Sequence, residues 1–113
     1  MEGYLAEVRC FALNFTPRGW MSCDGQLVAI SNNIALFSLI GTIYGGDGRT
    51  TFGLPDLRGR SPLGAGGGPG LQSYNQGARA SGNLIPAEGT SHEHGVLAMN
   101  WCICVDGTFP SSA

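Results

Sequence analysis

The sequence predicts a small α+β domain with short antiparallel strands, one buried helix and a long glycine-rich loop. Three observations predict this fold class. Runs of strand-forming residues lie at both ends of the chain, one apolar run with helical spacing lies between them, and 19 of the 113 residues are glycine. Because this length is typical of one domain, we expect residues 1–113 to form a single domain with an irregular glycine-rich excursion over 61–95.

The first 30 residues predict a β-meander. Three runs have the composition of short strands: Tyr4–Leu13, Trp20–Cys23 and Gln26–Ile30. A turn containing Pro17 and Gly19 separates the first two runs, and Asp24-Gly25 between the last two is a strong hairpin signal. We therefore expect three sequential strands, with Trp20 as an anchor in the core.

The next segment predicts the helix. Apolar residues follow helical spacing from Ile34 to Ile43, on most sides of the helix, so we expect it to be largely buried. Ser31 can cap its start through the hydroxyl group. Gly41 costs about 1 kcal/mol relative to alanine inside a helix, which indicates an early stop or a close packing contact there. The helix must end by Gly45-Gly46, and a short Thr-Thr-Phe strand follows.

The C-terminal run Val96–Val105 is the most strand-like in the chain. It is apolar on both faces, so we expect a central strand that turns at Asp106-Gly107. Cys102 and Cys104 lie on one face of this strand, while Cys10 and Cys23 lie near the N-terminus. The N-terminus has no classical signal peptide, and this favours buried thiols over one or two disulfides.

Composition excludes several classes of function. Only 12% of the residues are charged, all six basic residues are arginine, and the net charge is -2, which argues against nucleic-acid binding. No stretch reaches the roughly 18 apolar residues that cross a bilayer, so we expect no membrane insertion. So little charge also favours association between copies, although a poorly charged monomer surface is the alternative.

Catalytic and nucleotide-binding motifs are absent from the sequence. The glycine run Gly64–Gly68 has no lysine to reach a phosphate and no helix after it, so it is not a phosphate-binding loop. No serine lies in a Gly-x-Ser-x-Gly elbow, and only His92 and His94 could serve readily as a base. We therefore expect no enzyme.

Alternating acidic and basic residues among glycines form the densest polar stretch. We predict that they fix turns of the fold, because an arginine fork beside a carboxylate can satisfy loop carbonyls and lock a turn. The predicted turn residues are Asp24, Asp47, Arg49, Asp56, Arg58 and Arg60. Asp24 can join them by capping the first hairpin. A polar pocket for a ligand such as a sugar is the alternative.

His92-Glu93-His94 is the one metal-like pattern. In an extended segment the two imidazoles point the same way, as two ligands of one ion do. Two ligands do not close a site, so a monomer needs help from other side chains, whereas a trimer supplies six imidazoles on its axis. A metal ion at a trimer axis is the only cofactor that we consider, and a solvated loop is the alternative.

Three blocks of sequence carry a family resemblance. They are F-x-x-N-F-x-P-R-G-W-x-x-C-D-G-Q over Phe11–Gln26, A-L-F-S-L-I-G-T-x-Y-G-G-D-G-R-T-T-F-x-L-P-D-L-R-G-R over Ala35–Arg60, and A-M-N-W-C-I-x-V-D-G-x-F-P-S over Ala98–Ser111. Together they resemble the phage tail collar domain family, many of whose small bacterial members are called microcystin-dependent proteins. The resemblance covers Tyr4–Gly70 and Val96–Ser112.

The resemblance implies mainly a structural role. Collar domains occur in phage tail fibres, including the short tail fibres of T-even phages, where chains trimerise and the distal part binds the host surface. We therefore expect a self-assembling component of a phage tail or fibre, a tail-like particle or an extracellular filament. Its partners are other copies of itself, other tail proteins or host surface glycan. Its location is the virion tail or the cell surface, after a cytoplasmic stage before assembly.

The alternative function is a receptor- or glycan-binding module of a tail fibre or adhesin that uses the excursion over 61–95. Two features depart from the family pattern. Members usually carry a long variable region before the last strand, and only residues 71–95 fill that interval here. Fibre tips of related phages hold a metal through H-x-H motifs, whereas His92–His94 lies directly against the final strand.

Overall fold

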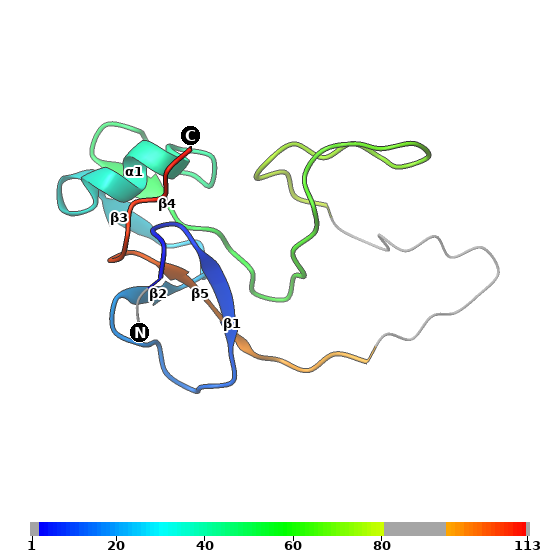
Figure 1. The fold of residues 1–113 in the computed structure, drawn as a ribbon, viewed down its shortest axis with the longest axis horizontal. Helices are drawn as coiled ribbons and strands as arrows, with labels where there is room; N and C mark the ends of the chain where they lie inside the picture. Colours follow the sequence, from blue (N-terminus) through cyan, green and yellow to red (C-terminus); the bar gives the residue numbers. More distant parts are fainter. Residues whose placement is uncertain (1–2, 81–94, 113) are drawn as a thin grey trace. The chain divides into compact units, whose positions relative to one another are not determined.

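The computed structural model describes residues 3–80 and 95–112 (Figure 1). The chain divides into two units, the first formed by Met1–Leu63 with Met99–Ala113 and the second by Gly64–Ala98. The described part of the first unit is a small α+β domain with antiparallel strands and one α-helix. To that extent the predicted fold class is confirmed.

A three-stranded sheet lies at the centre of the first unit. Its order is β1 (Val8–Phe11), β5 (Asn100–Cys104) and β2 (Trp20–Ser22), and both neighbours run antiparallel to β5 (Figure 1). The central position of the C-terminal strand is therefore confirmed. Its predicted start at Val96 is wrong, because β1 ends with Phe11 opposite Asn100 and the ladder has no partner for earlier residues.

The predicted β-meander is wrong. Strands β1 and β2 do not pair with each other, since β5 lies between them, and β3 (Leu27–Ala29) pairs instead with β4 (Thr51–Gly53) in a second sheet. The physical reason lies in β5. A strand that is apolar on both faces is most stable with a neighbour on each side and a covered face above and below.

The predicted hairpin at Asp24-Gly25 is wrong as well. The chain passes there from one sheet to the other, and Asp24 forms an antiparallel bridge with Asp56 that continues the β3–β4 register. The Gly25 amide donates to the Pro55 carbonyl at 3.1 Å. Gly25 does need its positive φ of 73°, but the bend redirects the chain between two sheets and does not reverse it within one.

The helix α1 (Ile34–Ile40) is shorter and more exposed than predicted. Ser31 does not cap it, because Ser31 lies in a 3₁₀ turn, η1 (Ile30–Asn32), and Asn33 occupies the capping position without a side-chain bond to the helix. Gly41 ends it with φ 52°, so the early stop is confirmed. Leu36 and Ile40 are buried, whereas Ile34 is 67% exposed, so one stripe of the helix is covered and not most of its surface.

Two apolar clusters lie on opposite faces of the three-stranded sheet, because the side chains of β5 alternate between them. The larger joins α1 and β4 to one face and contains Cys23, Leu36, Ile40, Phe52, Leu54 and Ile103. The smaller covers the other face and contains Trp20, Cys102 and Cys104, with Phe11 against it. Phe11 meets the Trp20 ring edge to face, with centroids 5.2 Å apart, so Trp20 is confirmed as a core anchor.

A β-bulge leads into β1. The Ala6 amide donates to the Cys104 carbonyl at 3.0 Å, while the Cys104 amide donates to the Glu7 carbonyl at 2.8 Å. Two residues, Ala6 and Glu7, therefore lie opposite the single residue Cys104. Ala6 adopts a φ of 70°, which costs a residue with a side chain about 1–2 kcal/mol. The bulge interrupts the regular ladder just before Val8, and this limits how far β1 extends toward the N-terminus.

The second unit has a different character. Its described residues contain no helix and no strand, only an isolated bridge between Gly66 and Tyr74, whose amides donate to each other's carbonyls at 2.6 and 3.0 Å. Leu71 is exposed there, as is Val96. The single irregular excursion over 61–95 stays a prediction, because residues 81–94 lie outside the described part of the chain.

Candidate functional site: the polar turns of the first unit

The turn after the helix is organised around one carboxylate. The Oδ1 atom of Asp47 accepts hydrogen bonds from the amides of Arg49, Thr50 and Thr51 at 2.8, 2.9 and 3.0 Å. Its Oδ2 atom accepts one from the Thr50 hydroxyl at 2.9 Å. Because a carboxylate accepts such bonds best when it is ionised, they hold the pKa of Asp47 well below its usual range, led by the amide of Thr51.

Glycines bring the backbone close enough to close this turn. Gly46 has φ 92°, and a Cβ on it would overlap the Phe52 Cα, while a Cβ on Gly53 would overlap the Tyr44 carbonyl. The Gly53 amide donates to the Gly45 carbonyl at 2.9 Å, and the Gly48 amide donates to the Thr51 carbonyl at 3.0 Å. Here the chain packs backbone against backbone, and no other residue type fits at Gly46 or Gly53.

A second carboxylate binds an arginine fork. Asp56 accepts from the Nε and Nη2 atoms of Arg58, both at 2.9 Å, and from the Arg58 amide at 3.2 Å. The fork lies at the surface, since the Arg58 side chain is 67% exposed. Hydrogen bonding and charge from Asp56 raise the pKa of Arg58 above its usual value.

Asp24 belongs to this second turn, and it does not cap a hairpin as predicted. Its backbone lies opposite Asp56 in the bridge, and its carboxylate accepts a hydrogen bond from the Ser22 hydroxyl at 2.9 Å. Two acidic residues directly opposite each other repel. The Arg58 guanidinium offsets this repulsion, because it pairs with Asp56 and is also attracted by Asp24. We call these three residues the Asp24–Asp56–Arg58 cluster.

Two of the predicted arginines contribute only backbone groups to these turns. Arg49 donates its amide to Asp47, and Arg60 donates its amide to the Leu57 carbonyl at 3.1 Å. Neither guanidinium makes an ion pair with a carboxylate in the described part of the chain. The structure therefore brings Asp24, Asp56 and Arg58 together and places Asp47 and Arg49 in a separate turn. That these residues fix the fold stays a prediction.

The predicted metal ligands His92 and His94 lie outside the described residues, and their role stays a prediction. Over residues 3–80 and 95–112, no three histidine, cysteine or acidic side chains gather in a way that could hold a metal ion. Within the same ranges, no helix has the length and apolar character that crossing a membrane requires.

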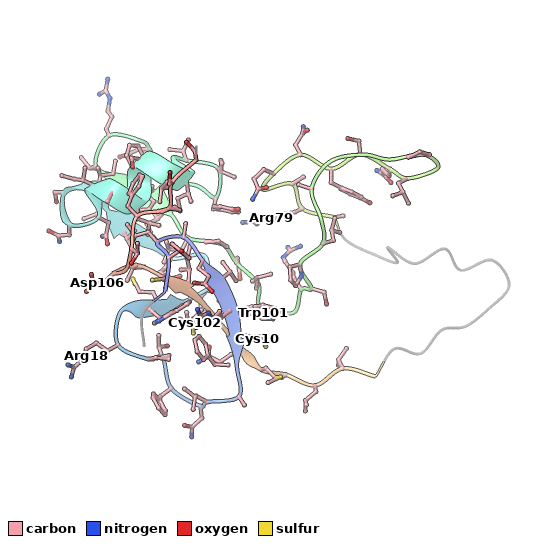
Figure 2. All side chains as sticks on the ribbon, in the orientation of Figure 1. Cys10, Arg18, Arg79, Trp101, Cys102 and Asp106 are labelled. Atoms are coloured by element: carbon pink, nitrogen blue, oxygen red, sulfur yellow. The ribbon has the colours of Figure 1, made fainter. Side chains whose placement is uncertain are left out.

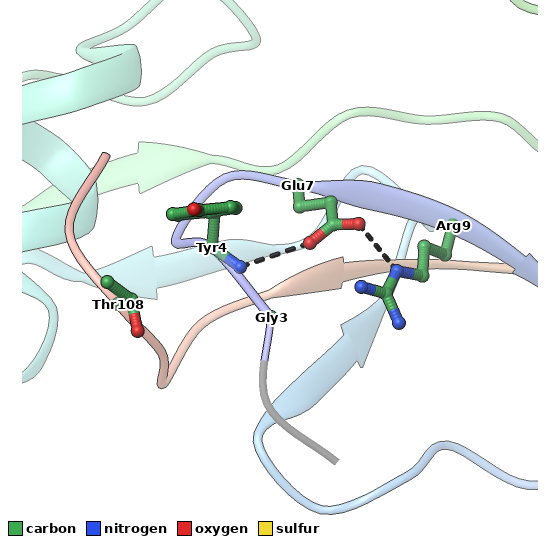
Figure 3. Close-up of a pocket in the computed structure, with 5 residues that line it drawn as sticks. All are labelled: Gly3, Tyr4, Glu7, Arg9 and Thr108. Atoms are coloured by element: carbon green, nitrogen blue, oxygen red, sulfur yellow. Dashed lines mark hydrogen bonds and ion pairs between the residues drawn. The ribbon is translucent and has the colours of Figure 1, made fainter. Parts of the chain in front are cut away.

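A small pocket that sequence reasoning missed lies where the two ends of the first unit meet (Figure 3). It has a volume of about 220 Å³ and is lined by Gly3, Tyr4, Glu7, Arg9 and Thr108. The segments are joined by the Leu5 amide, which donates to the Thr108 carbonyl at 2.8 Å, and by the Thr108 amide, which donates to the Gly3 carbonyl at 2.9 Å. Pockets for small molecules usually exceed this volume.

The charged groups of this pocket bind each other. Glu7 accepts from Arg9 Nε at 2.5 Å through one oxygen and from the Tyr4 amide at 3.0 Å through the other (Figure 3). The bond from Arg9, followed by that from Tyr4, lowers the pKa of Glu7. Arg9 also lies over the Trp20 ring, 5.2 Å from its centroid. The Glu-x-Arg spacing in a strand-forming run was the available sequence signal for this pair.

The four cysteines are free thiols in two kinds of environment. Cys23, Cys102 and Cys104 are buried, which confirms the prediction for them, whereas Cys10 is exposed, so the prediction is wrong for Cys10. Cys10 and Cys102 lie on the adjacent strands β1 and β5 (Figure 2). Their side chains point to opposite faces, since Cys102 is opposite Arg9 and not Cys10. Burial raises the pKa of Cys23 to about 12 and also raises the pKa values of Cys102 and Cys104.

Comparison with known proteins identifies the family. A family model described as the Phage Tail Collar Domain matches residues 6–62, a span that contains both polar turns, the helix and four of the five strands. No curated protein matches the chain. The likeness of the C-terminal block lies outside the matched range and stays a prediction. Because the match spans half of the chain, the protein belongs to the phage tail collar domain family, which implies a structural role in a phage tail fibre.

Proposed function

We propose that this protein is a self-assembling structural component of a phage tail or fibre, a tail-like particle or an extracellular filament. Family membership supports the structural role, and the surface of the protein supports the assembly. Among the described residues, seven large apolar side chains are buried and 13 are exposed. Single exposed apolar residues are ordinary, but this excess indicates surface that is covered in an assembled state.

The exposed apolar side chains are spread over the first unit, and several of them are aromatic. They include Tyr4, Val8, Leu13, Phe15, Leu27, Ile34, Ile43, Leu63, Met99 and Phe109. Aromatic residues are enriched at protein interfaces, where a large rigid side chain buries much area at a low entropy cost. With a charged fraction of 12% and a net charge of -2, electrostatic repulsion between copies is weak.

The polar turns support a scaffold in preference to a binding site. The two oxygens of Asp47 accept bonds from three nearby residues of its own loop, and Asp56 accepts a fork from Arg58 two residues away. Carboxylates that accept hydrogen bonds from their own loop are already engaged within the protein and are less available to a ligand. We therefore propose that the turns hold the chain in the shape that assembles, in the virion tail or at the cell surface.

The decisive measurement is the mass in solution. Size-exclusion chromatography with light scattering, over a hundredfold range of protein concentration, is expected to show a homo-oligomer or a filament. Negative-stain microscopy then shows its form. Phe15→Ser, which removes an exposed aromatic ring, tests the surface, and the exposed position Thr42→Ala is the control. A wild-type protein that stays monomeric at every concentration contradicts the proposal.

A receptor- or glycan-binding module is the second candidate. It is favoured by the second unit, whose described residues are mostly exposed and include the amide side chains of Gln72 and Asn75 beside Tyr74. Amides and an aromatic ring are groups that bind sugars through hydrogen bonds and stacking. A glycan array with the full chain tests this function, with Tyr74→Ala as the variant. If the intact protein binds no glycan on the array, this second candidate function is ruled out.

A further inference from the structure

We propose that the outer edge of β1 is a contact between two copies of this chain. In this contact two β1 strands pair antiparallel about a twofold axis, with Cys10 of one copy opposite Cys10 of the second copy. The inference rests on the self-assembly proposed above and adds the surface, the register and the symmetry of one contact.

Among residues 3–80 and 95–112, no strand pairs with the outer side of β1. Arg9 lies opposite Cys102 and Phe11 opposite Asn100, while the Cys104 amide donates to the Glu7 carbonyl. In an antiparallel ladder, hydrogen-bonded pairs alternate with pairs that are not bonded, so Val8 and Cys10 turn their N–H and C=O groups away from β5. No described residue forms a hydrogen bond with these outward groups. A neighbouring strand can pair with all of them.

The side chains leave this edge accessible. Val8 is 36% exposed and Cys10 is exposed, and both point to the same face of the sheet. Natural proteins protect an open edge with lysine, proline, an inward charge or a β-bulge. Strand β1 has no lysine and no proline, and its bulge at Ala6 lies before Val8, outside the strand itself. Its one charged side chain, Arg9, points to the opposite face, where it binds Glu7 (Figure 3). There the Arg9 guanidinium also lies over the Trp20 ring.

The other edge of the same sheet is different. Strand β2 has only three residues and is preceded by Pro17, whose ring removes a donor, and by the charged and exposed Arg18. After β2, the Cys23 amide still donates to the Trp101 carbonyl of β5 at 2.9 Å, while its carbonyl accepts a hydrogen bond from the Leu57 amide at 2.9 Å, so this end of the edge is covered by the segment after β4. The β1 edge is therefore the longer and less protected edge of this sheet.

Charge and geometry select the register. Because opposite residues must both turn their groups outward or both inward, a twofold axis can lie at Val8, Arg9, Cys10 or Phe11. An axis at Phe11 places Val8 opposite Asn14, which lies in a bend beyond the strand. An axis at Val8 brings the bulged residue Ala6 into the ladder, and an axis at Arg9 places two guanidinium groups directly opposite, where like charges repel. An axis at Cys10 places Arg9 against Phe11 of the second copy, an arrangement that favours a cation–π contact.

A second copy fits this edge better than an unrelated strand. The edge is self-complementary about Cys10, as a twofold contact requires, and the weakly charged chain offers little repulsion. Such a contact closes after two copies. A second contact elsewhere on the surface extends the pairs into a filament, in agreement with the proposed function.

Cross-linking through Cys10 tests the register. Residues opposite each other in a hydrogen-bonded pair have Cα atoms about 5.5 Å apart, which is within the range of a disulfide. Brief oxidation of the full chain by copper–phenanthroline, which accepts the electrons while each thiol loses its proton, is expected to yield a covalent dimer. Cys10→Ser is expected to abolish it, because the other three thiols are buried. A dimer that persists in Cys10→Ser overturns the inference.

A matched variant separates pairing from random collision. The double variant Cys10→Ser with Ser31→Cys carries one exposed thiol away from the sheet edge. We expect it to cross-link at least tenfold more slowly than the wild type, and equal rates overturn the inference.

A charge at the edge tests the contact without oxidation. Cys10→Lys places like charges opposite each other and is expected to weaken association by at least tenfold in light scattering, whereas Ser31→Lys leaves it unchanged. Thermal melting checks that both variants are folded. If the wild type associates but neither the cross-link nor Cys10→Lys behaves as expected, the edge contact is wrong and the proposed function stands. A monomeric wild type overturns both.

Discussion

Two turns of the first unit share the pattern Asp-x-Arg, yet they are built in different ways. In the turn of Asp47 the arginine contributes only its amide, and the carboxylate binds three successive amides. In the turn of Asp56 the arginine side chain itself binds the carboxylate through two nitrogens. The first turn is held by the backbone of its own loop and the second by a fork at the surface.

The difference shows that the Asp-x-Arg pattern alone does not determine which groups bind the carboxylate. Asp47 lies in a loop that glycines fold back on itself, so amides converge on its carboxylate. Asp56 lies opposite Asp24 in a bridge, where its carboxylate accepts the Arg58 amide at 3.2 Å and the Arg58 guanidinium interacts with both acids. Variants of each turn can measure how much each arrangement stabilises the fold.

The largest effect is expected at Gly46. Gly46→Ala places a Cβ on the Phe52 Cα in a backbone conformation that favours glycine, so we expect a loss of about 3 kcal/mol or more in the free energy of unfolding. Gly59→Ala is the matched control in the other turn. Gly59 also has a positive φ, of 65°, but has open space around it, so the expected cost is about 1 kcal/mol. Equal losses in urea unfolding would contradict the close packing at Gly46.

The next largest effect is expected for Asp47→Ala. Three amides and a hydroxyl lose their acceptor at once, and we expect the melting temperature to fall by roughly 6 °C. Arg49→Ala is the control, because the Arg49 amide remains and its side chain has no carboxylate partner in the described chain. A destabilisation by Arg49→Ala as large as that by Asp47→Ala would show that the arginine side chain holds this turn after all.

Acid should weaken the Asp47 turn selectively. The pKa of Asp47 is lower in the folded protein than its value of about 3.9 in an unfolded chain, so its stabilisation is complete above that value. It is lost as the pH falls below about 4 toward the folded pKa. Melting temperatures between pH 2 and 7 are expected to fall less steeply for Asp47→Asn than for the wild type. Glu7, whose pKa is also lowered, accounts for part of the remaining slope.

The smallest effect is expected in the second turn. Asp56→Ala removes an ion pair whose arginine is two-thirds exposed, so we expect a fall of about 3 °C in melting temperature, together with lower solubility. Arg58→Ala is expected to cost slightly more at low salt than at high salt, because it leaves Asp24 and Asp56 opposite each other without the guanidinium. Full stability of Asp56→Ala combined with loss of a ligand would instead indicate a binding site in this cluster.

The sequence predicted individual elements better than their pairing. The composition of residues 8–11, 20–22, 27–29 and 100–104 was correctly interpreted as strands, and the double-sided apolar pattern of the last one indicated its central place. The meander and the hairpin were wrong because neighbours in sequence were assumed to be neighbours in the sheet. Strand β5, which begins only at Asn100 and is apolar on both faces, competes more strongly for the place between β1 and β2.

The polar turns show the same limit at the level of side chains. The sequence indicated that Asp47, Asp56 and the nearby arginines belong to turns rich in glycine. It could not indicate that Arg49 would turn its guanidinium away, that Asp24 would lie opposite Asp56, or that Glu7 and Arg9 would pair beside Trp20. Each of these depends on residues far apart in the chain or on the path of the backbone.

By itself, the sequence determined the fold class, the family and the absence of a phosphate-binding lysine, since these depend on local composition and motifs. The tertiary structure decided which strands pair, which thiols are buried and which carboxylate binds backbone in place of arginine. It also decided that, among the described strands, β1 has a neighbour on one side only. Local preference selects the elements because it acts within a few residues, whereas pairing is selected by burial and by hydrogen bonds that only the assembled chain can complete.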